Sequence, residues 1–200
     1  MSTTLVTRTE ARFITCREVS EISGAPLAAV KKAVSQKVVR TRQELRGRKP
    51  IDVLDTRTAG AFTLLAETNV PLPIAAKRKV VNWAVTEPAI GTELQIDGLL
   101  TVKADGRLAE AQERASRYAQ LRDELIVSDP LISGGEPVFR GTRVPVRGLA
   151  RQIEMGETLE ILREDYDFLP EEAFEFAPLW ARANPKEGRP PRRAKTAPEQ

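Results

Sequence analysis

The side chains that could carry out chemistry are of few kinds in this chain. It holds no histidine and one cysteine, Cys16, beside 28 aspartates and glutamates. Without histidine, Ser-His-Asp and Cys-His catalysis and histidine-ligated zinc or haem sites are excluded. A single cysteine forms neither an intramolecular disulfide nor a thiolate zinc site. We therefore expect Cys16 to be a small core residue at the start of a helix.

Carboxylates are the remaining candidates for catalysis, since magnesium nucleases use them as metal ligands. They are dense near the C-terminus, at Glu154, Glu157, Glu160, Glu164, Asp165, Asp167, Glu171, Glu172 and Glu175. Adjacent residues diverge on a helix, and this spacing gives no recurrent inward pair, so a solvated acidic face is the preferred interpretation. We expect no catalytic residue, metal ligand or cofactor. A carboxylate–metal enzyme is the alternative.

The distribution of charge along the chain indicates more than its total of +3. The first 50 residues hold 11 basic and 4 acidic side chains, whereas residues 120–184 hold 7 basic and 13 acidic ones. Residues 185–200 are basic again, with 5 against 2. Because DNA affinity comes largely from neutralised phosphates, the basic N-terminal segment favours DNA as a partner. The acidic segment suits a protein partner, and a merely solvated surface is the alternative.

Two short helices joined by a glycine turn are predicted near the N-terminus. Thr15 can cap a helix that ends at Gly24, and Pro26 is suited to the start of a second helix. Residues 38–39 are expected to form a short strand. The pattern is that of a helix-turn-helix, whose second helix enters the major groove, although plain helical bundles share it. The predicted DNA-binding residues are Lys31, Lys32, Gln36, Lys37, Arg40 and Arg42.

The middle of the chain is predicted to be helical, with one β-hairpin. Apolar spacing indicates a helix from residue 59 to about 69, another from about 73 to before Pro88, and a long one at 106–125. Asp97-Gly98 between apolar residues predicts a hairpin over 93–103. No set of residues in this region requires chemistry.

A glycine- and proline-rich loop opens the last structured region. Short strand pieces are expected at residues 138–139 and 144–146, followed by helices at 146–155 and 158–166 and a last helix from Leu169. Pro178 should kink or restart that helix and present Trp180 at an angle. The residues of the loop that stand out are Gly134, Gly135, Arg140, Gly141, Thr142 and Arg143.

Two roles for the loop arginines are open. Arg140 and Arg143 flank a Gly-Thr turn whose backbone N–H groups can hold an anion. The alternative is that the arginines brace the turn through carboxylates such as Glu136 or Asp165. Binding of DNA by this acidic region would need its arginines to gather on one face.

Residues 132–184 resemble the small trihelical domain of domain-of-unknown-function family 433. The hallmark Gly-Gly-x-Pro-x-x-Arg-Gly-Thr-Arg-x-Pro-Val occupies residues 134–146, and a Glu-Asp-Tyr triplet occupies 164–166. Asp167 departs from the proline that is common in the family. The resemblance covers about a quarter of the chain and implies a helix-turn-helix-like fold for it.

The chain as a whole is similar to longer proteins of this group, which resemble VapB-type antitoxins of type II toxin–antitoxin pairs. They share an Ala-Asn-Pro-x-x-Gly-Arg-Pro segment, here residues 183–190. The resemblance implies an autorepressor that binds operator DNA and blocks a VapC-like PIN-domain ribonuclease. On the basis of this resemblance, the toxin-binding candidates are Trp180, Arg182, Arg189, Arg192 and Arg193. Tail arginines could enter a carboxylate-lined nuclease site or lie along nucleic acid.

These observations predict a mainly α protein with a small β-hairpin, an N-terminal helix-turn-helix and a C-terminal trihelical domain. The expected units are residues 1–50, 51–126, 127–184 and a basic tail at 185–200. No run approaches the roughly 18 apolar residues of a membrane span, and residues 1–10 lack a secretory pattern, so we expect a cytoplasmic protein with no membrane partner. A homodimer is expected, because repressors that read palindromic sites are usually dimers. A stand-alone regulator without a toxin is the alternative function.

Overall fold

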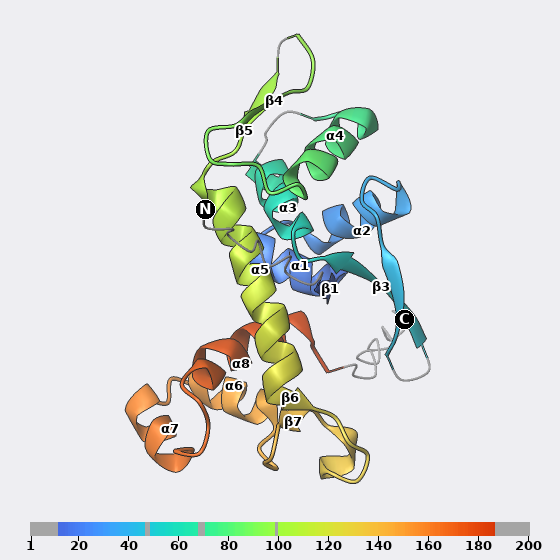
Figure 1. Ribbon diagram of the computed structural model, residues 1–200. Helices are drawn as coiled ribbons and strands as arrows, with labels where there is room; N and C mark the ends of the chain where they lie inside the picture. Colours follow the sequence, from blue (N-terminus) through green and yellow to red (C-terminus); the bar gives the residue numbers. More distant parts are fainter. Residues whose placement is uncertain (1–11, 47–48, 68–70, 99, 187–200) are drawn as a thin grey trace, which may run out of the picture.

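The N-terminal unit combines two helices with a three-stranded sheet (Figure 1). The computed structural model describes residues 12–46, 49–67, 71–98 and 100–186. The elements of this unit are β1 (Phe13–Thr15), α1 (Cys16–Ser23), α2 (Leu27–Ser35), β2 (Arg42–Arg46) and β3 (Lys49–Asp55). The helices confirm the predicted helix-turn-helix pattern, and the hairpin of β2 and β3 follows α2 directly.

Helix α1 begins and ends at the residues that its sequence predicts. The Thr15 hydroxyl accepts a hydrogen bond from the Glu18 backbone N–H at 3.2 Å, and the Glu18 carboxylate accepts one from the Thr15 N–H at 2.6 Å. This reciprocal pair is a capping box, which satisfies two backbone donors of the first turn. Gly24 ends the helix with φ of 73°, a left-handed conformation that glycine adopts without steric cost.

The sheet of this unit has the order β1-β3-β2, with antiparallel pairing throughout. The strand expected at residues 38–39 is wrong. Val38 and Val39 lie in a bend after α2, and their apolar side chains are buried in the hydrophobic core. The expected unit boundary at residue 50 falls inside β3, so the N-terminal unit extends to Asp55.

The middle of the chain agrees closely with its predicted elements. It contains α3 (Thr58–Glu67), α4 (Ile74–Ala84), β4 (Glu93–Gln95), β5 (Thr101–Lys103) and α5 (Gly106–Leu125). Asp105 caps α5 by accepting hydrogen bonds from the backbone N–H groups of Arg107 and Leu108. Helix α5 runs from the β4–β5 hairpin past α1 to the C-terminal unit (Figure 1). It therefore connects the two ends of the molecule.

Helices α3 and α5 approach closely at Gly60. A Cβ at this position would lie 2.7 Å from the Leu108 carbonyl oxygen and 3.0 Å from the Gln112 Cγ. We expect Gly60→Ala to lower the free energy of unfolding by about 1–3 kcal/mol, because the backbone of α5 would have to move. Chemical denaturation measures this change. Gly148→Ala is the control, since a Cβ there meets Pro145 at an ordinary 3.7 Å, and it should instead stabilise by about 0.4–1 kcal/mol.

The C-terminal unit is a three-helix arrangement entered through a small two-stranded sheet. It contains β6 (Ile126–Val127), η1 (Ser133–Gly135), β7 (Val138–Phe139), α6 (Val146–Glu154), α7 (Leu159–Asp165) and α8 (Glu172–Ala183). The strand piece expected at 138–139 is present as β7, whereas Val146 begins α6. Of the kink or restart expected at Pro178, the restart is wrong, because α8 continues through that residue.

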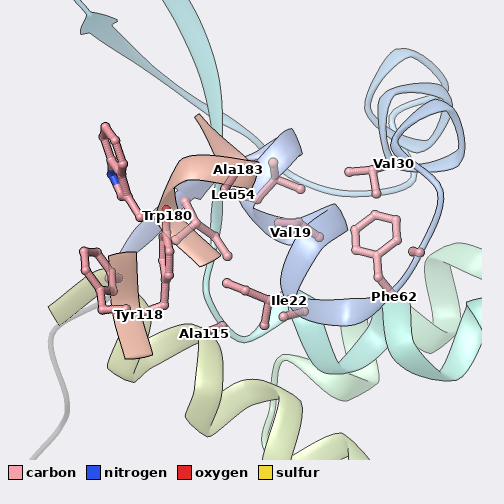
Figure 2. Close-up of a cluster of buried hydrophobic side chains, with 14 of the residues drawn as sticks. Val19, Ile22, Val30, Leu54, Phe62, Ala115, Tyr118, Trp180 and Ala183 are labelled. Atoms are coloured by element: carbon pink, nitrogen blue, oxygen red, sulfur yellow. The ribbon is translucent and has the colours of Figure 1, made fainter. Parts of the chain in front are cut away.

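One hydrophobic core joins the N-terminal and C-terminal units. Buried residues of α1, α2, β3, α3, α5 and α8 belong to a single cluster, and Figure 2 labels nine of its members. Val19 and Ile22 of α1 lie among Leu54, Ala115, Tyr118 and Ala183 in this view. A smaller cluster of Ala76, Val80 and Ile96 lies under the β4–β5 hairpin. The fold is mainly α with small β elements, as predicted, and α1 is fixed directly against α8.

Candidate nucleic-acid interface

The outward face of α2 is a ridge of small and basic side chains. Ala28, Lys31, Lys32 and Ser35 are exposed, whereas Val30 and Ala33 are buried beneath them. This alternation follows from helical geometry, because residues three and four apart share a face. Alanine and serine at the ridge allow close approach to another surface, and the lysines supply charge. Such a face suits the major groove of a nucleic acid duplex.

A groove of about 1160 Å³ runs along one side of this ridge. Its walls come from the start of α1, from α2, from β3 and from the end of α8. Asp52 is its acidic residue, and its basic residues are Arg17, Lys31, Lys49, Arg147 and Lys186. The groove thus carries a net charge of +4 and joins the N-terminal unit to the end of the C-terminal unit.

The other side of the ridge faces a smaller hollow formed with α3 and α4. Lys32 and Gln36 line it together with Lys77 of α4. The neighbouring Arg78 donates hydrogen bonds to the backbone carbonyls of Lys37 at 3.0 Å and Gln36 at 3.1 Å. Arg78 therefore caps the C-terminal end of α2. The run Lys77–Lys79 was not among the predicted residues, although three consecutive basic residues mark it in the sequence.

The six predicted DNA-binding residues do not share one surface. Lys31 lines the large groove, Lys32 and Gln36 line the smaller hollow, and Lys37 is exposed at the end of α2 with φ of 54°. Arg40 and Arg42 line a separate hollow with Phe13, and the Arg42 guanidinium lies 5.2 Å from the centre of that ring. The structure therefore groups Lys31 and Lys32 on the ridge and places the two arginines elsewhere.

A buried polar network lies behind the groove and is centred on Glu18, whose side chain has no exposed surface. Its carboxylate accepts hydrogen bonds from the Tyr118 hydroxyl at 3.0 Å and from the Arg122 guanidinium at 3.3 Å, besides the Thr15 N–H. Arg122 also donates to the Phe13 carbonyl at 3.1 Å. Burial, followed by the nearby Glu18 carboxylate, raises the pKa of Tyr118 far above its usual range. Tyr118 is therefore a neutral donor at physiological pH.

The network extends to the end of α8. The Asn184 amide donates to the Tyr118 hydroxyl at 3.1 Å, and the Arg147 guanidinium donates to the Asn184 carbonyl at 2.7 Å. Arg147 also stacks 5.0 Å above the ring of Trp180. These contacts fix the position of Arg147 on the groove wall relative to α1.

The glycine-rich loop of the C-terminal unit positions Arg140 over the end of α5. The Arg140 guanidinium donates to the carbonyls of Glu124 at 2.8 Å, Asp123 at 2.9 Å and Ile126 at 3.2 Å. Gly141 turns the chain with φ of 78°, and the Thr142 hydroxyl accepts a hydrogen bond from the Val144 N–H at 3.0 Å. Arg140 thus braces the turn, through backbone carbonyls of α5 rather than through the expected carboxylates.

The C-terminal unit is similar to a known family. Residues 126–181 match the model of the family described as protein of unknown function DUF433. A relative, the uncharacterized protein y4eO of Sinorhizobium fredii, is 39% identical over 90 residues, which are 45% of this chain and 40% of that protein. The X-ray crystal structure of Rv2018 from Mycobacterium tuberculosis aligns with 82% of this chain and 95% of its own at 17% identity. Its TM-score of 0.32 does not establish a shared fold.

The contacts of Arg140 in the C-terminal unit predict a structural role. Arg140→Ala should lower the free energy of unfolding by about 0.5–1.5 kcal/mol, because three carbonyls at the end of α5 lose a hydrogen-bond donor and solvent can replace part of it at this exposed site. Arg140→Lys should not restore stability, since an ammonium cannot reproduce the planar fork. Arg143→Ala is the matched control in the same motif: Arg143 is exposed like Arg140 but makes no hydrogen bond or ion pair with any described residue, so thermal denaturation should show little change. Equal losses at the two positions would contradict this role.

The toxin-binding candidates differ in their accessibility. Trp180 is only 5% exposed and packs in the core beneath Arg147. It is therefore not accessible to a partner, which a toxin-binding residue would need to be. The Arg182 side chain is about half exposed, and its Nε lies 3.5 Å from a Glu21 carboxylate oxygen. Arg189, Arg192 and Arg193 lie outside the described residues.

Within the described part of the chain, no three acidic or thiol side chains gather in a way that could hold a metal ion. No helix within the described ranges has the length and apolar character needed to cross a membrane. Cys16 is half-buried beside the large groove, and burial, followed by the nearby Asp52 charge, raises the pKa of its thiol.

Proposed function

We propose that this protein is a sequence-specific DNA-binding regulator that uses α2 as its recognition helix. The observation that carries the proposal is the exposed ridge of Ala28, Lys31, Lys32 and Ser35 on the second helix of a helix-turn-helix. Such a helix lies in the major groove, where lysines reach phosphates or guanine edges and an alanine methyl contacts thymine. The basic residues on both sides of the ridge support this proposal over the alternative of a plain helical bundle.

The β2–β3 hairpin is the second contact surface of this proposal. It follows α2 directly, as the wing does in winged helix-turn-helix proteins, and its sequence Arg46-Gly47-Arg48-Lys49 is strongly basic. Gly47 and Arg48 lie outside the described residues. Lys49 lines the same groove as Lys31, so a duplex seated on α2 would also meet β3. Arg17 and Lys186 of that groove would face the phosphate backbone.

The experiment is titration of the full chain with duplex DNA from upstream of its own gene. Four or five phosphate contacts from the groove and ridge predict that log affinity falls with log salt with a slope of about −3 to −5. An unrelated duplex of equal length should bind more weakly, with a similar slope. A slope near zero, or equal affinity for both duplexes, would contradict a sequence-specific DNA-binding function.

Cys16 can report on DNA binding, because it is the single cysteine of the chain and lines the groove beside α2. Its raised thiol pKa should make alkylation slow at neutral pH, since the thiolate is the reactive form. We expect saturating duplex to slow this alkylation further by covering the groove. Unchanged alkylation with duplex bound would place the DNA on another surface.

We further propose that the regulator is an autorepressing antitoxin that also neutralises a VapC-like PIN-domain ribonuclease. This half of the proposal rests on the resemblance to VapB-type antitoxins and on the basic tail. The positive charge of the tail arginines is complementary to a carboxylate-lined nuclease site. Co-expression with the product of the adjacent reading frame tests it. A stable complex that suppresses ribonuclease activity is expected.

Failure to form that complex would leave the alternative of a stand-alone regulator. Deletion of residues 187–200, which keeps Lys186 in the groove beside α2, should weaken ribonuclease inhibition and leave operator affinity largely intact, whereas the reverse outcome would assign the tail to nucleic acid. The proposal also includes a homodimer on a palindromic operator. Light scattering of the free and DNA-bound protein measures this stoichiometry.

A further inference from the structure

A second groove, of about 560 Å³, lies between α1, α5 and α8. Its floor is apolar and its rim is mainly acidic. The floor is formed by Ile22, Tyr118, Leu121, Phe176 and Leu179. The rim carries Glu21, Glu110, Glu113, Glu172 and Glu175 with Arg114 and Arg117. The net charge of this groove is therefore −3, opposite in sign to the groove beside α2.

Several of these glutamates are available to a cationic ligand. Glu172 pairs with Arg117 at 3.1 Å, and Glu21 lies 3.5 Å from Arg182. Glu110, Glu113 and Glu175 form no ion pair with any described residue. An occupant should thus combine an apolar or proline surface for the floor with guanidinium or ammonium groups for the rim.

The C-terminal segment of this chain has that chemistry. Residues 189–195 read Arg-Pro-Pro-Arg-Arg-Ala-Lys, with four positive charges and no negative one. Consecutive prolines favour the polyproline II conformation, and such segments dock on aromatic-lined apolar grooves. Arginine beside them makes charge-assisted hydrogen bonds to carboxylates. Of the two grooves, the basic one beside α2 would repel this segment.

The segment also has the required reach. The described chain ends at Lys186, which lines the groove beside α2 together with Ala183 and Asn184. An extended chain covers about 3.3 Å per residue, so Lys186 lies within about 10 Å of Ala183 and residues 187–195 add about 30 Å. The stretch of α8 from Glu175 to Ala183 is only about 12 Å long. Residues 189–195 are therefore long enough to turn back around the end of α8 and reach the groove between α1, α5 and α8.

We propose that residues 189–195 dock in this groove of their own chain, with the prolines over Leu121 and Leu179 and the arginines against the rim glutamates. The tail is then held at rest on the face formed by α1, α5 and α8, and is released when an anionic partner competes for its arginines. This proposal does not depend on DNA binding by α2.

Paramagnetic relaxation in the full chain tests the proposal. A nitroxide is attached at Ala197→Cys in a Cys16→Ala background, and backbone amide signals are compared before and after reduction of the label. The amide signals of Leu121 and Leu179 should be weakened by a factor of about two or more at low ionic strength, where exposed charges are least screened. Glu172→Lys with Glu175→Lys should abolish this weakening, and adding Arg192→Glu with Arg193→Glu should restore it.

A second variant carries Arg192→Glu and Arg193→Glu while the groove is left unchanged. Because these tail residues do not contribute to the described core, the variant should fold normally. It should also abolish the weakening of the Leu121 and Leu179 signals. Three results would overturn the proposal: no effect at Leu121 and Leu179, an effect confined to residues of the α2 groove, or an effect seen only between labelled and unlabelled molecules in a mixture. The last result would assign the groove to the tail of a second copy.

Discussion

Replacing Glu18 by alanine is expected to lower the free energy of unfolding by about 3–5 kcal/mol, a shift in melting temperature on the order of 10 °C for a chain of this length. The side chain is fully buried and accepts hydrogen bonds from the Thr15 N–H, the Tyr118 hydroxyl and Arg122. Its removal breaks the capping box and leaves the largely buried Arg122 without this partner. Chemical denaturation followed by circular dichroism measures the loss.

Glu21→Ala is the matched control on the same helix. Glu21 is partly exposed, and its one described ion pair joins it to an Arg182 side chain that is about half exposed. Exposed pairs of this kind contribute about 0–1 kcal/mol, so this variant should be close to wild type. Similar losses for the two variants would mean that the buried network does not hold α1 against α5.

Replacing Lys31 and Lys32 together by alanine is expected to weaken binding to operator DNA about 10- to 100-fold at moderate salt. Both lysines are exposed on the ridge of α2, one beside each of the hollows that flank it. The slope of log affinity against log salt should become shallower by about two units, one for each lost phosphate contact. Filter binding or fluorescence anisotropy over a range of salt concentrations measures both quantities.

Lys103→Ala provides the control for this variant. Lys103 is an exposed lysine of β5 and lines neither of the hollows beside α2. It should leave affinity and salt slope unchanged, while the lysines of α2 should not affect stability because they carry no core contact. Unchanged DNA binding by the Lys31 and Lys32 variant would show that another helix faces the duplex.

The sequence by itself determined the local elements, because their signals are local. Thr15, Gly24 and Pro26 delimited α1 and α2, Asp97-Gly98 marked the β4–β5 hairpin, and α5 spans the predicted residues. Capping, glycine at positive φ and apolar spacing act over a few residues, so they can be recognised without tertiary information. The strand predicted at residues 38–39 was wrong, because a short apolar run is compatible with a buried bend as well as with a strand.

Only the tertiary structure decided which distant residues meet, since those contacts depend on packing rather than on local preference. Strand β3 pairs with β1, some 40 residues earlier in the chain, and Glu18 meets Tyr118 across a separation of 100 residues. The same packing placed Arg40 and Arg42 away from Lys31, turned Arg140 onto the carbonyls of α5 and buried Trp180. The basic and acidic segments can be recognised from composition alone. Their placement in two grooves of opposite charge depends on the packing of α1 between α5 and α8.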